Sequence, residues 1–135
     1  MTGRHRTNPR RRGTQAIEFA MVLPVIMAII AGVVDFGEYL HRTQTLVHAS
    51  SDGARAGAKS EDRPLTAART AAQTAWDTAG GAGAPEFTVT LAGSAPNQRV
   101  VVAASMAYEP YFGLVPTPET IDYSCTFRLD HQPED

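Results

Sequence analysis

The sequence has one cysteine, Cys125, and one tryptophan, Trp76, among its 135 residues. A single thiol can form neither a disulfide within the chain nor a cysteine-based zinc site, and it could pair only with another chain. The place of Cys125 on the apolar side of an expected strand favours a buried, unreactive thiol. Trp76 is the expected anchor of a small core, with stacking on a ligand as the alternative.

Motifs for catalysis are also scarce. His41 and His48 lie two helical turns apart, a separation of about 10 Å that does not suit a shared metal. Residues 50–52, Ser-Ser-Asp, are close to His48 only along the chain, which provides no nucleophile-to-base geometry. The glycine-rich GGAGA lacks the lysine of a phosphate-binding loop. We therefore predict a protein that is not an enzyme and that has no cofactor and no metal site.

Acidic residues are absent from the first 13 residues. That segment holds five of the 12 basic residues, all arginine, whereas residues 14–135 hold the other seven and all 14 acidic ones. The two parts carry charges of +5 and −7, which sum to the net charge of −2. Such asymmetry indicates that the two ends work in different environments.

Charge is missing again from Phe19 to Val34, a run of sixteen residues, and from Thr14 the only charge before Val34 is Glu18. Twenty-one helical residues, from Thr14 to Val34, span about 31 Å, close to the thickness of the bilayer hydrocarbon. Arginines before the run and Asp35 after it follow the positive-inside pattern. Residues 14–36 are thus predicted to cross the cytoplasmic membrane once, with the N-terminus inside and the C-terminus outside. A buried helix of a soluble protein is the alternative.

Two residues within the apolar run need an explanation. Pro24 would break a helix in water, but membrane helices tolerate proline, so it predicts a kink and not a stop. Glu18 costs up to about 2.5–3.5 kcal/mol at the bilayer centre and less near the interface. One explanation is an interfacial acid, which would gain about 0.3–1 kcal/mol from the helix dipole if it lay in the first turn of the helix.

A secretory signal peptide shares the basic start and apolar run, but here the run ends in the bulky and charged DFGEYL. Cleavage before the run is more plausible, because Gly13 is a small residue at its border. The order basic tail, Gly13, Thr14-Gln15-Ala16-Ile17-Glu18-Phe19 and apolar helix resembles the cleavage signal of type IV pilin-like precursors. The longer EFAMVLPVIMAIIAGVVDFGEYL is similar to the opening of TadE-like proteins, pseudopilins of the tight-adherence (Tad/Flp, type IVc) pilus, and AYEPYFGLVPTPETIDYSCTFRLD more loosely resembles their closing segment.

The resemblance implies a division into a basic cytoplasmic leader peptide (residues 1–13), a transmembrane helix (14–36) and an extracytoplasmic domain (37–135). It implies that a prepilin peptidase cuts between Gly13 and Thr14, and that Glu18 and Phe19 take part in recognition and assembly. Glu18 would pair with the Thr14 amine of a neighbouring subunit. The implied partners are the peptidase, other pilins and pseudopilins, the Tad assembly platform and the lipid bilayer.

Length favours a minor pseudopilin that takes part in pilus assembly, because the major Tad pilin is little more than its helix. The alternative is an uncleaved, signal-anchored membrane protein whose outer domain binds a ligand or protein at the cell surface. The arginine tail does not require nucleic acid as a partner, because it lacks interleaved aromatic residues and attraction to anionic lipid accounts for it.

The outer part is predicted to be α+β. Residues 38–59 continue the first helix with Leu40, Leu46, Val47, Ala54, Ala56 and Ala58 recurring near helical spacing, and residues 61–81 form a second helix with an apolar stripe of Leu65, Ala68, Ala72, Ala75, Trp76 and Ala79. The period then changes to two in residues 87–91, 99–108 and 123–129, which predict three antiparallel strands with one face on the helices. Residues 109–119 are a proline-containing loop that exposes aromatic residues. We expect it to fold over the sheet edge, with partner binding as the alternative.

Overall fold

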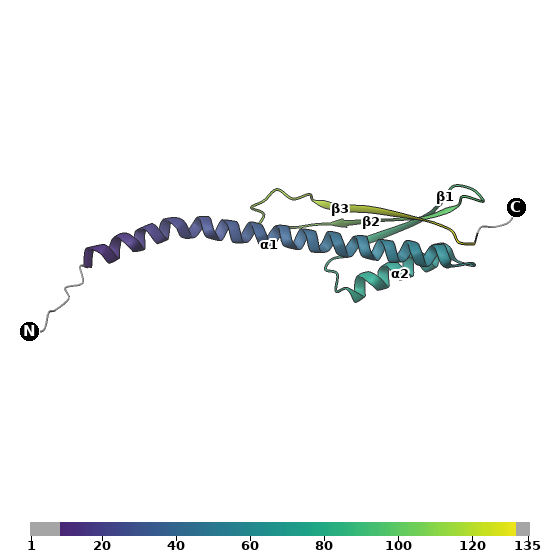
Figure 1. Cartoon of the computed structure of the whole chain (residues 1–135), viewed down its shortest axis with the longest axis horizontal. Helices are drawn as coiled ribbons and strands as arrows, with labels where there is room; N and C mark the ends of the chain where they lie inside the picture. The colour runs from purple at the N-terminus through teal and green to yellow at the C-terminus, as the bar shows by residue number, and fades with distance from the viewer. Residues whose placement is uncertain (1–8, 132–135) are drawn as a thin grey trace, which may run out of the picture.

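A single long helix forms the axis of the molecule (Figure 1). The computed structural model describes residues 9–131, and it describes side chains from residue 15 onward. The elements, in chain order, are α1 (Pro9–Lys59), α2 (Pro64–Thr78), β1 (Glu86–Ala92), β2 (Arg99–Ala107) and β3 (Thr120–Arg128). The predicted α+β class, with its two helices followed by a three-stranded antiparallel sheet, is confirmed. Part of the expected leader, residues 1–8, lies outside the described residues.

Helix α1 continues without interruption from the apolar run into the outer domain. Pro24 lies inside it and does not end it, and Figure 1 shows a gentle curve over the first half of the helix. The kink itself stays a prediction. Helix α2 begins with Pro64 in its first turn. The missing N–H of proline has no cost there, because N–H groups of the first turn have no partner within the helix. Helix α2 ends before Gly80, which has a φ of 68°, a left-handed conformation that glycine adopts without strain.

The strands form a sheet in the order β1-β2-β3, with both pairs antiparallel. Val102 in the central strand lies opposite Val89 on one side and Cys125 on the other. One face of the sheet packs on the helices, since inward side chains alternate with outward ones along each strand. The core combines residues of all five elements: Leu46, Ala49, Ala54, Ala68, Ala72, Trp76, Phe87, Val89, Val100, Val102, Ala104, Met106, Ile121 and, next to the strands, Tyr108 and Leu129.

Four residues assigned to apolar faces are exposed instead. About two fifths of the surface is exposed in Leu40, Leu65 and Leu91, and Ala79 is exposed just beyond the end of α2. Leu65 and Leu91 lie one residue from an end of their elements, and Ala79 follows the last residue of α2, so the periodic face has fewer packing partners there. The assignment of Cys125 is also only partly right, because its side chain is half-buried and lies 3.7 Å from the Ser51 hydroxyl.

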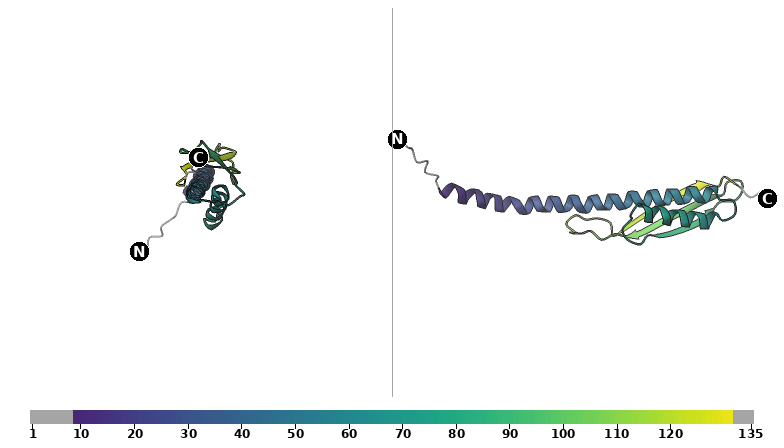
Figure 2. Two further views of the ribbon diagram at one scale, coloured as in Figure 1. Left: turned by 90° about the vertical axis from the view of Figure 1, so that its right-hand side faces the viewer. Right: turned by 90° about the horizontal axis from the view of Figure 1, so that it is seen from below.

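The first half of α1 projects away from the outer domain (Figures 1 and 2). The connection between β2 and β3, residues 108–119, is called the junction loop below. It extends past the end of the sheet and lies beside α1 (Figure 2), where Val115 approaches Gly32 and Phe112 binds Asp35. The expectation that this loop folds over the sheet edge is therefore wrong. Its prolines and aromatic residues extend along the helix, because Asp35 holds its turn there.

Candidate functional site: the membrane helix and its junction with the outer domain

Large apolar side chains cover the projecting part of α1 on all sides. Exposed residues on this stretch are Ile17, Phe19, Met21, Val22, Leu23, Val25, Ile26, Met27, Ile29, Ile30, Val33, Val34 and Phe36. The most apolar part of the helix has a mean hydropathy of 2.5, and only 6% of that part is buried in the chain. A surface of this kind requires lipid or other helices around it. Its length and composition fit a single-pass membrane protein.

Glu18 and Phe19 lie on this exposed surface. Phe19 is 63% exposed and Glu18 is also exposed. Among residues 15–131, Glu18 has no hydrogen-bonding or ion-pair partner. Gly13 and Thr14 also lie in the first part of α1, before residue 15, where the description of side chains begins. The carboxylate is therefore available to a group from outside residues 15–131.

At the other end of the apolar stretch, Asp35 is completely buried. Its carboxylate accepts hydrogen bonds from the backbone N–H groups of Phe112, at 3.0 Å, and Gly113, at 2.9 Å. Gly113 has a φ of 63°, and this left-handed turn lets two successive N–H groups converge on one anion. The aspartate that the sequence suggests as a flanking charge thus binds the junction loop to α1.

Tyr108 makes a second connection between the loop and the helix. Its hydroxyl donates a hydrogen bond of 2.8 Å to the Asp35 backbone carbonyl, and its ring lies edge-on to Tyr39. Burial, and then the negative charge of Asp35, raise the pKa of Tyr108 above its usual value. The hydroxyl therefore stays protonated and remains a donor at every physiological pH.

Arg42 lies over the Tyr108 ring, with its guanidinium carbon 5.5 Å from the ring centroid. It also forms an ion pair of 2.7 Å with Glu38, one helical turn earlier. Burial opposes its charge, but the hydrogen bond and charge of Glu38, together with an interaction with Tyr111, outweigh burial and raise the pKa of Arg42. This fully charged group holds Glu38, Tyr108 and Tyr111 around one side of α1.

Asp35→Ala should release the junction loop. The substitution removes both acceptors of the Phe112 and Gly113 N–H groups, and the expected loss in free energy of unfolding is about 1–3 kcal/mol. Urea unfolding of the full chain in detergent micelles measures this loss, and amide hydrogen exchange should show faster exchange at Phe112 and Gly113. Asp52→Ala, which removes an exposed aspartate from the same helix, is the matched control. Equal effects of the two substitutions would contradict the role of Asp35.

Comparison with known families identifies the N-terminal part of the chain. Residues 13–55 match the family of TadE-like proteins. This segment is TadE-like. The resemblance to TadE-like proteins seen in the sequence is confirmed over about a third of the chain. No curated protein and no solved structure matches the chain.

The TadE-like segment includes most of α1, with Glu18, Pro24 and Asp35 inside it, whereas α2, the sheet and the junction loop lie beyond it. A close contact that reasoning from the sequence missed lies at the C-terminal end of this segment and just beyond it. Gly53 and Gly57 lie one turn apart on α1, where added Cβ atoms would stand only 2.7 Å from atoms of α2. Their GxxxG spacing is the signal that would have revealed this face. For Asp35 no such signal exists in the sequence.

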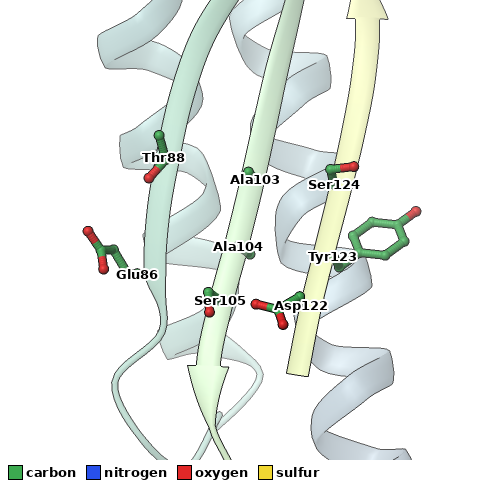
Figure 3. Close-up of a pocket in the computed structure, with 8 residues that line it drawn as sticks. All are labelled: Glu86, Thr88, Ala103, Ala104, Ser105, Asp122, Tyr123 and Ser124. Carbon is green, nitrogen blue, oxygen red and sulfur yellow. The ribbon is translucent and has the colours of Figure 1, made fainter. Parts of the chain in front are cut away.

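The outward face of the sheet is polar. Figure 3 shows Glu86, Ser105 and Asp122 on the three strands, where they line an open pocket, and the strand register makes them direct neighbours. The TadE-like segment contributes nothing to this face. Within the described residues, no group of three or more histidine, cysteine, aspartate or glutamate side chains could hold a metal ion.

Proposed function

We propose that the protein is a minor pseudopilin of a tight-adherence pilus, processed after Gly13 by a prepilin peptidase, and that it takes part in pilus assembly without being an enzyme. The observation that carries this proposal is the TadE-like match, which begins at Gly13, the residue at the border of the expected leader. The long, exposed apolar helix that follows supports it. Residues 1–13 are then the leader, 14–36 the transmembrane helix and 37–135 the outer domain, with the leader in the cytoplasm and the domain outside.

Cleavage would change the environment of Glu18. Thr14 would become the first residue of the mature chain and would carry a free α-amine, and Glu18 would lie in the first turn of the helix. An unpaired carboxylate in lipid is unfavourable by up to about 2.5–3.5 kcal/mol. Pairing with the Thr14 amine of a neighbouring subunit removes this cost and sets the axial position of one helix against the next. Other pilins and pseudopilins and the assembly platform are thus the proposed partners.

Processing is tested by the intact mass and N-terminal sequence of the protein purified from membranes, with and without a co-expressed prepilin peptidase. We expect a chain that begins at Thr14 only when the peptidase is present, and no cleavage in Gly13→Leu. A chain that keeps its arginine tail in both samples would instead indicate a permanently anchored protein, whose outer domain binds a ligand or protein at the cell surface.

Assembly is tested by Glu18→Ala in cells that contain the pilus system. We expect cleavage to proceed but the amount of protein recovered with other pilins after membrane crosslinking to fall about tenfold, as loss of roughly 1.4 kcal/mol of contact energy would give. Asp52→Ala, on the same helix but in the outer domain, should leave recovery unchanged. Unchanged recovery with Glu18→Ala would remove the proposed role of this carboxylate.

A further inference from the structure

We propose that the junction loop is a second membrane contact, which inserts Tyr111, Phe112 and Leu114 into the outer boundary of the bilayer beside α1. The inference rests on α1 spanning the membrane, but it does not depend on cleavage after Gly13 or on pilus assembly. Its basis is the position of the loop along the helix, its composition and its hydrogen bonds.

The loop reaches the level of the last turns of the apolar stretch. Val115 lies so close to Gly32 that a Cβ atom there would stand 3.0 Å from the valine methyl group. Gly32 precedes Phe36 by four residues, or about 6 Å along the helix. The tip of the loop therefore lies at the depth where α1 still exposes Val33, Val34 and Phe36.

The loop tip has the composition of a membrane interface. Residues 110–118 carry no charge, and Glu109 and Glu119 stand at the two ends of this uncharged stretch. Tyr111, Phe112 and Leu114 are 66%, 59% and 60% exposed. Tyrosine is enriched where membrane proteins pass from lipid to water, with its ring among the lipids and its hydroxyl toward water. Here Tyr111 interacts with the charged Arg42, which lies further along α1 toward the outer domain.

Backbone polarity ordinarily keeps loops out of lipid, because N–H groups without partners are costly there. In this loop, the N–H groups of Phe112 and Gly113 bind the Asp35 carboxylate, and Pro110, Pro116 and Pro118 have no N–H group. The arrangement works in both directions. The loop satisfies a carboxylate at the end of the membrane helix, and the carboxylate satisfies the turn that brings the aromatic side chains to the lipid.

Lipid is the occupant that the surface favours over a second copy of the chain. The exposed side chains of the loop lie at the level of the exposed Val33, Val34 and Phe36, and along residues 17–30 of α1 the apolar surface is present on every side of the helix. A partner chain would need a complementary shape at one place, whereas the bilayer boundary meets the loop and the helix at the same level.

Depth-dependent quenching of tryptophan fluorescence tests the proposal. The full chain, carrying Phe112→Trp or Leu114→Trp, is reconstituted into phosphatidylcholine vesicles whose acyl chains are brominated either near the glycerol end or near the methyl end. Trp76 is 1% exposed in the core, so the unmodified protein supplies an unquenched background. Met27→Trp reports the membrane helix, and Leu91→Trp reports β1 in the outer domain.

We expect Phe112→Trp and Leu114→Trp to lose most of their added emission with bromine near the glycerol end and less with bromine near the methyl end. Met27→Trp should be quenched more by the deeper bromine, and Leu91→Trp by neither. If Met27→Trp is quenched but neither loop variant is, the proposed loop contact is overturned, while the membrane position of α1 stands. If the emission of the loop variants changes with the protein-to-lipid ratio but not with bromine, the loop contacts a second copy of the chain, and the proposed membrane contact is overturned.

Discussion

Trp76→Ala should destabilise the outer domain by about 3–5 kcal/mol, because it removes the largest side chain of the core. Trp76 is 1% exposed and is the largest fully buried side chain of the described residues. It projects from α2 into the core that the helices share with the sheet, and Gly81 lies directly on its ring. Small domains are stable by only about 5–15 kcal/mol in total, so the variant should be close to unfolding at room temperature.

Urea unfolding of the full chain in detergent micelles, followed by circular dichroism, measures this loss without needing the tryptophan signal. Leu65→Ala removes an exposed apolar side chain from the same helix, and its effect on the free energy of unfolding should be much smaller. A loss below about 1 kcal/mol for Trp76→Ala would show that the core does not depend on this ring, since emptying a filled space of that size destabilises a packed core by more.

The second large effect concerns the contact between α1 and α2. In the double variant Gly53→Ala/Gly57→Ala, the new methyl groups would stand 2.7 Å from the Ala68 carbonyl oxygen and the Ala68 Cβ atom, respectively. Because backbone atoms of α2 line both positions, the helices must move apart. Overpacking of this kind costs about 1–3 kcal/mol at one site, and we expect the double variant to lose more than either single one.

Gly37→Ala is the matched control, because it makes the same change on the same helix at a place where an added Cβ atom has nothing within 4 Å. Alanine is favoured over glycine inside a helix by about 1 kcal/mol. The control should therefore raise the free energy of unfolding while the double variant lowers it, as judged by the same urea titration. Stabilisation in both cases would mean that α1 and α2 do not pack at Gly53 and Gly57.

Secondary structure followed closely from local patterns. The change of hydrophobic period from helical to alternating marks the passage from α2 to β1, and Pro64 and Gly80 mark the two ends of α2. The burial of individual residues on a helix or strand face was predicted less well from the sequence. Leu65 has the right period, but its side chain is exposed, although the backbone of the same turn lies against Gly57 of α1. Periodicity reports the direction of a side chain from its own element, and it carries no information on the extent of the opposing surface.

The sequence alone determined the long apolar helix, the charge contrast across it, the TadE-like segment and the α+β order of elements, since all of these depend on neighbours along the chain. Only the tertiary structure decided the roles of Asp35 and the junction loop, which lie more than seventy residues apart. The local sequence around an aspartate that follows an apolar run is the same whether its carboxylate binds water or two backbone N–H groups. The position of the loop, the burial of that carboxylate and the level at which aromatic side chains meet the membrane helix all arise from this one long-range contact.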